Sequence, residues 1–239
     1  MAGGVMAIYH FSVHVISRRA GRSAVKAAAW RAGERLRDEL TGELANFTNR
    51  QDVLHSEILM PPDAPVWMGD RGRLWNAVGA TEKRIDAQLC REITFAIPHE
   101  LSRGQALALL RGFCARAFVN RGMVADISLH AAAEGGDQRN TYANVLLTTR
   151  TIEASAFGRK VREWNSRECL IRWRAEWAHA VNTALADAGR PERVDHRAGV
   201  QNHLGEPHLH LGGAATQMER RGIKTERGDL LRTAKAPSI

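Results

Sequence analysis

The sequence predicts an α+β fold in which helices pack on one face of an antiparallel β-sheet, as an α+β sandwich. Four segments alternate apolar and polar residues with the period of half-buried strands, namely 7–16, 91–97, 123–130 and 142–150. Longer segments carry apolar residues at helical spacing between capping signals. A glycine-containing loop joins the last two strands as a hairpin, which makes that pair antiparallel.

The N-terminal third is predicted to form a strand, a helix and a mixed segment. One face of the first strand comprises Tyr9, Phe11, Val13 and Val15. Residues 23–38 are rich in alanine and predict a helix, which would hold Trp30 rigidly and facing the sheet. After a mixed segment that extends to about Pro65, four apolar residues fall near helical spacing: Leu74, Val78, Ile85 and Leu89.

The central segments are a strand and a helix. In the strand 91–97, Ile93, Phe95 and Ile97 share one face, and Glu92 and Thr94 share the other.

The helix that follows is predicted from its capping residues and its stripe of apolar residues. Ser102 and Gln105 have the spacing of a capping box, and Gly122 can supply the C-terminal cap. The apolar stripe between them comprises Leu107, Leu110, Cys114 and Phe118.

The predicted hairpin brings three polar side chains together. His130 ends the strand 123–130, on the same face as Asp126 and Ser128. Tyr142 and Asn144 project together from the next strand, while its core face comprises Ala143, Val145 and Leu147. We therefore expect His130 to be a cross-strand neighbour of the Tyr142 and Asn144 pair.

The last predicted element is a helix from about Ser166 to Ala188, ended by Gly189 and Pro191. Its buried stripe comprises Leu170, Trp173, Trp177, Val181 and Leu185.

Composition limits the classes of protein that the chain can belong to. At 239 residues and 44% hydrophobic content, it suits one domain, or one domain with a short tail. Its cysteines, Cys90, Cys114 and Cys169, are odd in number and widely spaced, which argues against a disulfide framework or a zinc knuckle and favours a reducing cytoplasm. No stretch reaches the roughly 18 apolar residues that a membrane span needs.

The charge balance favours a nucleic-acid partner. Lys and Arg number 34 against 26 Asp and Glu, which gives a net charge of +8, and most of the cations are arginines. Guanidinium groups bind phosphate oxygens bidentately. The alternative is a generic basic protein without a specific partner.

Several segments together resemble the motifs of one family. They are 6–12, 17–18 and 21–25 near the start, 91–98 and 137–150 in the middle, and 193–197, 210–212 and 218–222 toward the end. In these segments the chain is similar to plasmid-mobilisation relaxases of the MobA/MobL (MobQ) type, which belong to the HUH-endonuclease superfamily. The resemblance spans nearly the whole chain and implies the HUH fold, and a metal-dependent enzyme that cuts one DNA strand with a tyrosine.

The departures from the family pattern fall on the chemistry. Trp30 stands where the family has its nucleophilic tyrosine, and an indole offers no oxygen that could attack phosphorus. Of the family's three metal-binding histidines, His130 is present, whereas Tyr142 and Asn144 stand at the other two positions. A neutral phenol and an amide are poor ligands, so the Mg²⁺ or Mn²⁺ of the family is expected to bind weakly or not at all.

Other site residues follow from the resemblance, each with an alternative. Glu92 matches the acidic residue that supports the metal histidines, but it can also simply pair with an arginine. His130 can be a structural histidine, and of the pair His208 and His210 only His210 matches the family pattern. Single-stranded DNA is expected to contact the first motif, at Arg18, Arg19, Arg22, Ser23 and Arg31.

Two functions therefore remain open. The chain is either a relaxase of plasmid mobilisation at an origin of transfer or a non-catalytic descendant that binds that DNA or a protein partner. Accessory mobilisation proteins and a type IV secretion coupling protein are the expected partners, in the cytoplasm. The expected boundaries are an N-terminal extension at 1–5, a relaxase domain at 6–225 and a flexible tail at 226–239.

Overall fold

The computed structural model describes residues 7–132, 137 and 139–196, and every element below belongs to one compact unit, Met1–Asp195. The expectations for 1–5, 226–239, His208 and His210 lie outside the described residues.

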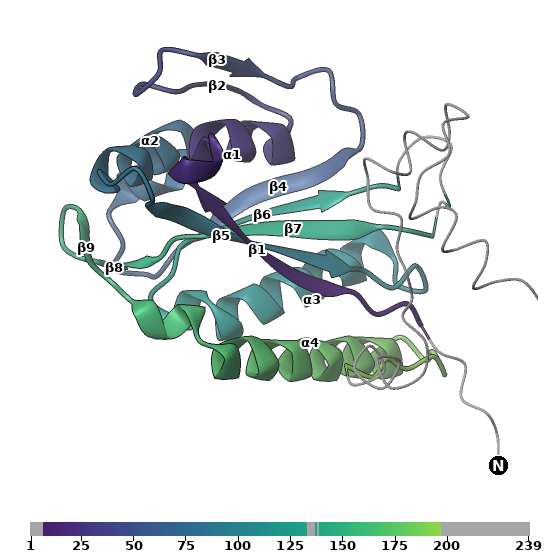
Figure 1. The fold of residues 1–239 in the computed structure, drawn as a ribbon. Helices are drawn as coiled ribbons and strands as arrows, with labels where there is room; N and C mark the ends of the chain where they lie inside the picture. The colour runs from purple at the N-terminus through teal and green to yellow at the C-terminus, as the bar shows by residue number, and fades with distance from the viewer. Residues whose placement is uncertain (1–6, 133–136, 138, 197–239) are drawn as a thin grey trace, which may run out of the picture. The chain divides into compact units, whose positions relative to one another are not determined.

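A five-stranded antiparallel sheet forms the centre of this unit, in the order β1-β5-β7-β6-β4 (Figure 1). Its strands are β1 (Phe11–Ser17), β5 (Gln88–Ala96), β7 (Tyr142–Leu147), β6 (Ala125–His130) and β4 (Val53–Leu59). The sheet confirms the predicted α+β class and the predicted β6–β7 hairpin. Strand β4 was not predicted, because all of its residues are only half-buried and its apolar residues do not alternate regularly.

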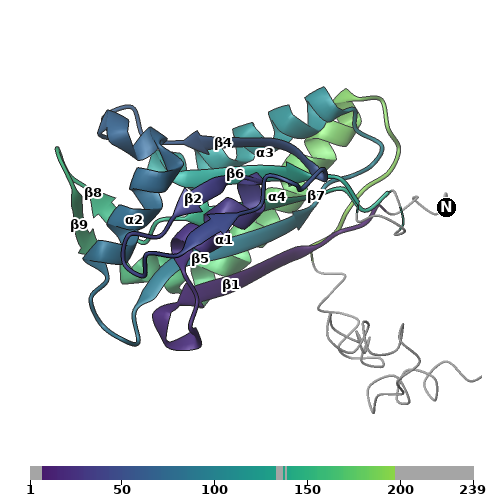
Figure 2. The ribbon, with the colours of Figure 1, turned by 90° about the horizontal axis from the view of Figure 1, so that it is seen from above.

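Helices cover both faces of the sheet, as Figures 1 and 2 show. Helices α1 (Ala24–Ala32) and α2 (Arg71–Thr81) lie on one face, and α3 (Arg103–Ala117) and α4 (Arg167–Asp187) lie on the other. The expectation of helices on one face was therefore wrong. The polar face of the strands is buried as well, because α1 and α2 supply partners for its charged groups: Arg31 of α1 for Glu92, and Arg71 of α2 for Asp126.

The pair that joins α2 to the sheet is Arg71 and Asp126. The Nε and Nη2 atoms of Arg71 donate to Asp126 at 2.9 to 3.1 Å, and the Trp75 indole donates to the same carboxylate at 2.8 Å. A buried carboxylate is tolerated when it is paired in this way.

Each face of the sheet has its own apolar core. The larger core contains Ile93, Phe95, Ala143 and Val145 from the strands, packed against α3 and α4. The predicted stripe of α4 lies in this core: Trp173, Trp177, Val181 and Leu185 are buried, and Leu170 is partly buried against them. The smaller core lies under α1 and α2 and contains Ile16, Cys90 and Leu146.

Helices α1 and α2 end well before the predicted residues. Helix α1 ends at Ala32 instead of residue 38, because Gly33 adopts a left-handed φ of 67° and the chain continues into a small hairpin, β2 (Arg35–Arg37) and β3 (Leu44–Asn46). Helix α2 ends at Thr81, so that Ile85 is 80% exposed in a loop and Leu89 belongs to β5.

The remaining elements are short. A second two-stranded sheet pairs β8 (Arg150–Ile152) with β9 (Phe157–Lys160), and 3-10 turns span Arg18–Ala20, Val66–Gly69, Val119–Arg121 and Arg162–Asn165. The predicted capping box of α3 is present, with Ser102 and Gln105 each bonded to the other's backbone. Gly122 caps the 3-10 turn after α3 and not the helix itself.

Candidate nucleic-acid interface

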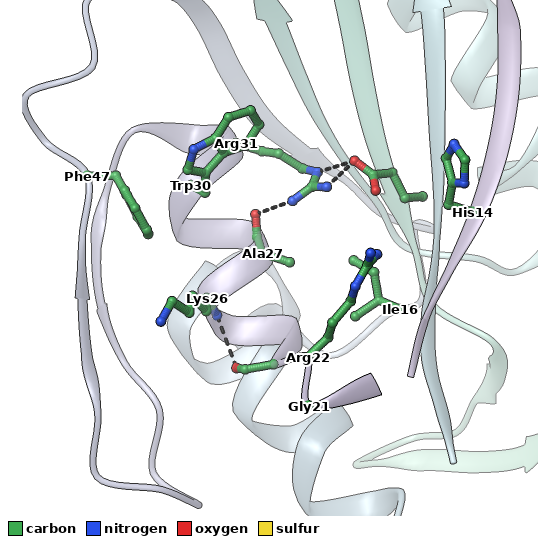
Figure 3. A pocket seen from close by; sticks show the side chains of 11 residues that line it. His14, Ile16, Gly21, Arg22, Lys26, Ala27, Trp30, Arg31 and Phe47 are labelled. Atoms are coloured by element: carbon green, nitrogen blue, oxygen red, sulfur yellow. Dashed lines mark hydrogen bonds and ion pairs between the residues drawn. The ribbon is translucent and has the colours of Figure 1, made fainter. Parts of the chain in front are cut away.

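A groove of about 640 Å³ lies between α1 and the β1 edge of the sheet (Figure 3). Strand β1 contributes His14 and Ile16, helix α1 contributes most of the opposite wall, and Glu92 of β5 also lines the groove. This groove is where the segments expected to bind DNA meet the position expected for the nucleophile.

The start of α1 is fixed by Ser23. Its hydroxyl accepts from the Lys26 backbone N–H at 3.1 Å and donates to Asp38 Oδ2 at 2.5 Å. An N-terminal cap of this kind stabilises a helix by about 1 kcal/mol. Ser23 therefore holds the helix that forms the groove, and its hydroxyl is already engaged.

Three arginines of the first motif, Arg18, Arg19 and Arg22, have different surroundings. Arg22 is exposed and points into the groove, whereas Arg19 is exposed in the 3-10 turn outside its lining. The Nη2 of Arg18 donates to the carbonyl oxygens of Gly79 and Glu82 at 2.8 and 2.9 Å, which ties the turn to α2. Arg18 therefore has a structural contact, and Arg22 faces the open space.

Arg31 is held by the sheet. Its guanidinium binds one carboxylate oxygen of Glu92 through Nε and Nη2 and donates to the Ala27 carbonyl at 2.8 Å. Both side chains of the Arg31–Glu92 pair are more than 85% buried. The pairing of Glu92 with an arginine, one of the two alternatives from the sequence, is thus present in the structure.

Two aromatic side chains and a lysine complete the groove wall. Trp30 and Phe47 line it together, and Lys26 lies on the same side of α1. Lys26 pairs with Glu43 at 2.5 Å, but both side chains are about half exposed. An exposed pair of this kind is worth little, so Lys26 can exchange its partner for a phosphate.

Trp30, at the position expected for the nucleophile, is 39% exposed near the C-terminal end of α1. It does not face the apolar core. The guanidinium of Arg50 covers the ring at 3.7 Å from its centroid, and the ring of His130 lies 6.3 Å away. The rigid placement expected from the sequence holds, but the side chain borders the solvent.

His130 is completely buried at the end of β6. Neither ring nitrogen has a hydrogen-bond partner among the described residues, and the nearest carboxylate oxygen, Asp52 Oδ2, lies 3.6 Å from Nδ1. Burial, together with the charge of Arg50, lowers the pKa of His130 to about 4, and Asp52 opposes this only in part. The imidazole is therefore neutral at pH 7.

The other two positions of the expected metal site have different contacts. Tyr142 pairs with His130 in the register of β6 and β7, and the two rings stack. Burial raises the pKa of the Tyr142 phenol, which Arg50 opposes in part, so the phenol stays protonated. The Oδ1 of Asn144 accepts from the Thr94 hydroxyl at 2.8 Å.

This set of donors does not fit a divalent metal ion. One neutral imidazole is available, but the phenol is protonated and the amide oxygen, a weak ligand, already accepts a hydrogen bond from Thr94. Among the residues that the structure describes, no group of three or more His, Cys, Asp or Glu side chains is arranged to hold a metal.

Four residues of the site had no signal in the sequence. Phe47, Arg50 and Asp52 lie in the segment between α1 and β4, where no periodicity marks a role, and Lys26 is an unremarkable position of a helix. Arg50 and Asp52 are only two residues apart in the sequence, but nothing in the sequence placed them beside His130.

The sequence matches the profile of the MobA/MobL family over residues 22–221. The chain belongs to the MobA/MobL family. The mobilization protein MobL of Acidithiobacillus ferridurans is 37% identical over 90% of this chain, and the chain spans 65% of that relative. This assignment confirms the family resemblance found in the sequence motifs.

Solved structures agree with this assignment. A structure described as "Molecular Basis of Vancomycin Resistance Transfer in Staphylococcus aureus" aligns with a TM-score of 0.73 and 30% identity over 79% of this chain and 98% of that one. The conjugative relaxase TrwC, in complex with oriT DNA and metal, aligns over 96% of this chain and 93% of that one with a TM-score of 0.51 and 13% identity, a similarity of fold alone. The MobA/MobL chain therefore has the relaxase fold.

No helix in the described part of this family member is long and apolar enough to cross a membrane.

Proposed function

We propose that this protein binds single-stranded origin-of-transfer DNA in the groove between α1 and β1 during plasmid mobilisation, and that it does not cleave the strand. The observation that carries the proposal is the composition of the groove, in which cations and aromatic rings face the same open space. Arg22 and Lys26 are exposed there beside Trp30 and Phe47.

This arrangement suits a single strand. Phosphates are neutralised by the cations, while bases stack on aromatic rings with about 1–3 kcal/mol per base. The TrwC relaxase of the same fold is described in complex with oriT DNA. Arg31 contributes mainly by fixing the wall, because Glu92 already holds its guanidinium.

The proposal that the strand is not cleaved rests on the residue at the expected nucleophile position. Trp30 has no hydroxyl, and the chain contains only two tyrosines. Tyr9 lies on the opposite side of the sheet, where its hydroxyl donates to the Arg174 carbonyl at 2.9 Å, and burial raises its pKa to about 12. Tyr142 lies in β7 and stacks on His130, so neither phenol replaces the lost one on α1.

The same proposal includes protein partners. Accessory mobilisation proteins and a type IV secretion coupling protein would bind this protein while it holds the DNA. The three cysteines are free and buried, which supports a reducing compartment such as the cytoplasm, where plasmid DNA is found.

Fluorescence anisotropy with labelled single-stranded origin DNA tests the binding. The affinity should fall steeply between 50 and 300 mM salt, and Arg22→Ala should weaken binding and reduce the salt slope by about 0.7, as for one lost phosphate contact on a single strand.

Arg116→Ala is the matched control, because Arg116 is an exposed arginine of α3 on the opposite face of the sheet. Equal effects of the two substitutions, or an affinity that does not depend on salt, would favour a protein-binding scaffold. A covalent protein–DNA adduct on a denaturing gel would contradict the loss of cleavage.

A further inference from the structure

Arg50 contacts both Trp30 and Asp52 at the place expected for the family's metal site. Its Nη1 donates to the Trp30 carbonyl at 2.6 Å, its guanidinium lies 3.7 Å from the centroid of the Trp30 ring, and its Nε donates to Asp52 Oδ1 at 2.9 Å. Its Nη2 binds the second oxygen of Asp52, and the side chain is only 13% exposed. The guanidinium is therefore fixed on three sides.

Asp52 connects this cation to His130. One carboxylate oxygen of Asp52 lies 3.6 Å from His130 Nδ1. The position is set by the backbone, because the Asp52 carbonyl accepts from the Ala131 N–H at 2.8 Å, next to the end of β6. Guanidinium, carboxylate and imidazole thus follow one another in a row.

In this arrangement the Asp52 carboxylate is not free to bind a divalent ion at His130. Asp52 is the only Asp or Glu side chain in ion-pair range of His130 among the described residues, and both of its oxygens are bound to Arg50. An ion at His130 would also lie close to a fixed positive charge, and in a partly buried site the repulsion between such charges is large.

We infer that the guanidinium of Arg50 is the resident cation of this site and that its charge, fixed by Asp52 and Trp30, opposes the binding of a divalent metal ion at His130. Weak metal binding at this site then has two causes: the residues at positions 142 and 144, and a built-in cation that occupies the Asp52 carboxylate and repels a second positive charge. This inference does not depend on whether the protein binds DNA.

Titration with Co²⁺ tests it, because the visible spectrum of Co²⁺ reports imidazole coordination directly. The starting protein carries Tyr142→His and Asn144→His, which supply the two missing imidazoles. Co²⁺ affinity is then compared among this protein, the same protein with Arg50→Gln, and the same protein with Arg50→Lys, each checked by its thermal unfolding.

Arg50→Gln should tighten Co²⁺ binding by about tenfold or more, since the repulsion is removed and Asp52 is released. Arg50→Lys keeps the positive charge and should leave the affinity within about threefold of the starting protein. The inference is overturned if Arg50→Gln changes the affinity by less than about twofold. It is equally overturned if Arg50→Lys tightens binding as much as Arg50→Gln.

Discussion

The imidazole of His130 stacks on the phenol ring of Tyr142, with the ring centroids 4.8 Å apart and the planes inclined by 15°. The pair follows from the register of the β6–β7 hairpin, in which these two residues lie directly opposite one another. Position 142 thus packs against the buried histidine through its aromatic ring.

Tyr142→Phe should therefore unfold at nearly the same urea concentration as the wild-type protein, whereas Tyr142→Ala should lose about 1–3 kcal/mol of stability. The reason is that phenylalanine keeps the stacked ring and alanine leaves the buried face of His130 uncovered. Equilibrium unfolding in urea measures both. A large loss in Tyr142→Phe would show that the hydroxyl, and not the ring, stabilises the site.

Trp30 is expected to act as a stacking surface for a base. Trp30→Ala should weaken binding of single-stranded origin DNA by about 5- to 100-fold, which corresponds to one lost stacking contact. Trp30→Phe retains an aromatic face and should stay within about threefold of the wild type. Anisotropy titrations at one salt concentration decide this, and equal affinities for wild type and Trp30→Ala would remove Trp30 from the DNA contacts.

Cleavage should return only when nucleophile and ligands are restored together. The triple variant Trp30→Tyr, Tyr142→His and Asn144→His should form some covalent adduct with origin DNA in Mn²⁺ or Mg²⁺. Trp30→Tyr alone should form little, because His130 is then the only imidazole of the site. The assay is a denaturing gel with and without EDTA. Metal-independent cleavage by the single variant would mean that the cation is not needed for the attack.

Glu82 should make the stability depend on pH. Burial disfavours its ionised form, but hydrogen bonds from Arg150 and Lys160 outweigh this and lower the pKa of Glu82. Because the folded pKa lies below the unfolded value of about 4.3, this stabilisation is complete above about pH 5 and is lost as the pH falls through the folded pKa.

Glu82→Gln should consequently lower the free energy of unfolding by about 1–3 kcal/mol at pH 7, since the carboxylate is only 7% exposed. The difference from the wild type should shrink as the pH is lowered below 4. Thermal unfolding of both proteins at several pH values provides the measurement. As a control, Asp86→Asn removes an exposed carboxylate that pairs with the exposed Arg84 and should change little.

The alternation of apolar and polar residues within individual strands determined much of the sheet. It predicted β5, β6 and β7, and it predicted which face each residue of β7 presents, because side chains two apart in a strand must share a face. A capping box predicted where α3 begins, and the predicted bounds of the last helix, about Ser166 to Ala188, agree with α4. The sequence motifs led to the family. Their resemblance also carried the expectation that Trp30, Tyr142 and Asn144 stand at positions where the family has other residues.

Only the tertiary structure decided what surrounds those positions. Arg50 and Asp52 lie in a loop without periodicity, and their place beside His130 follows from the pairing of β4 with β6, strands separated by 65 residues between Leu59 and Ala125. The second helical layer was also beyond the sequence pattern, because a strand's polar face looks the same whether it meets water or a buried partner such as Arg71. Local periodicity records which face a side chain takes, and only packing determines what that face touches.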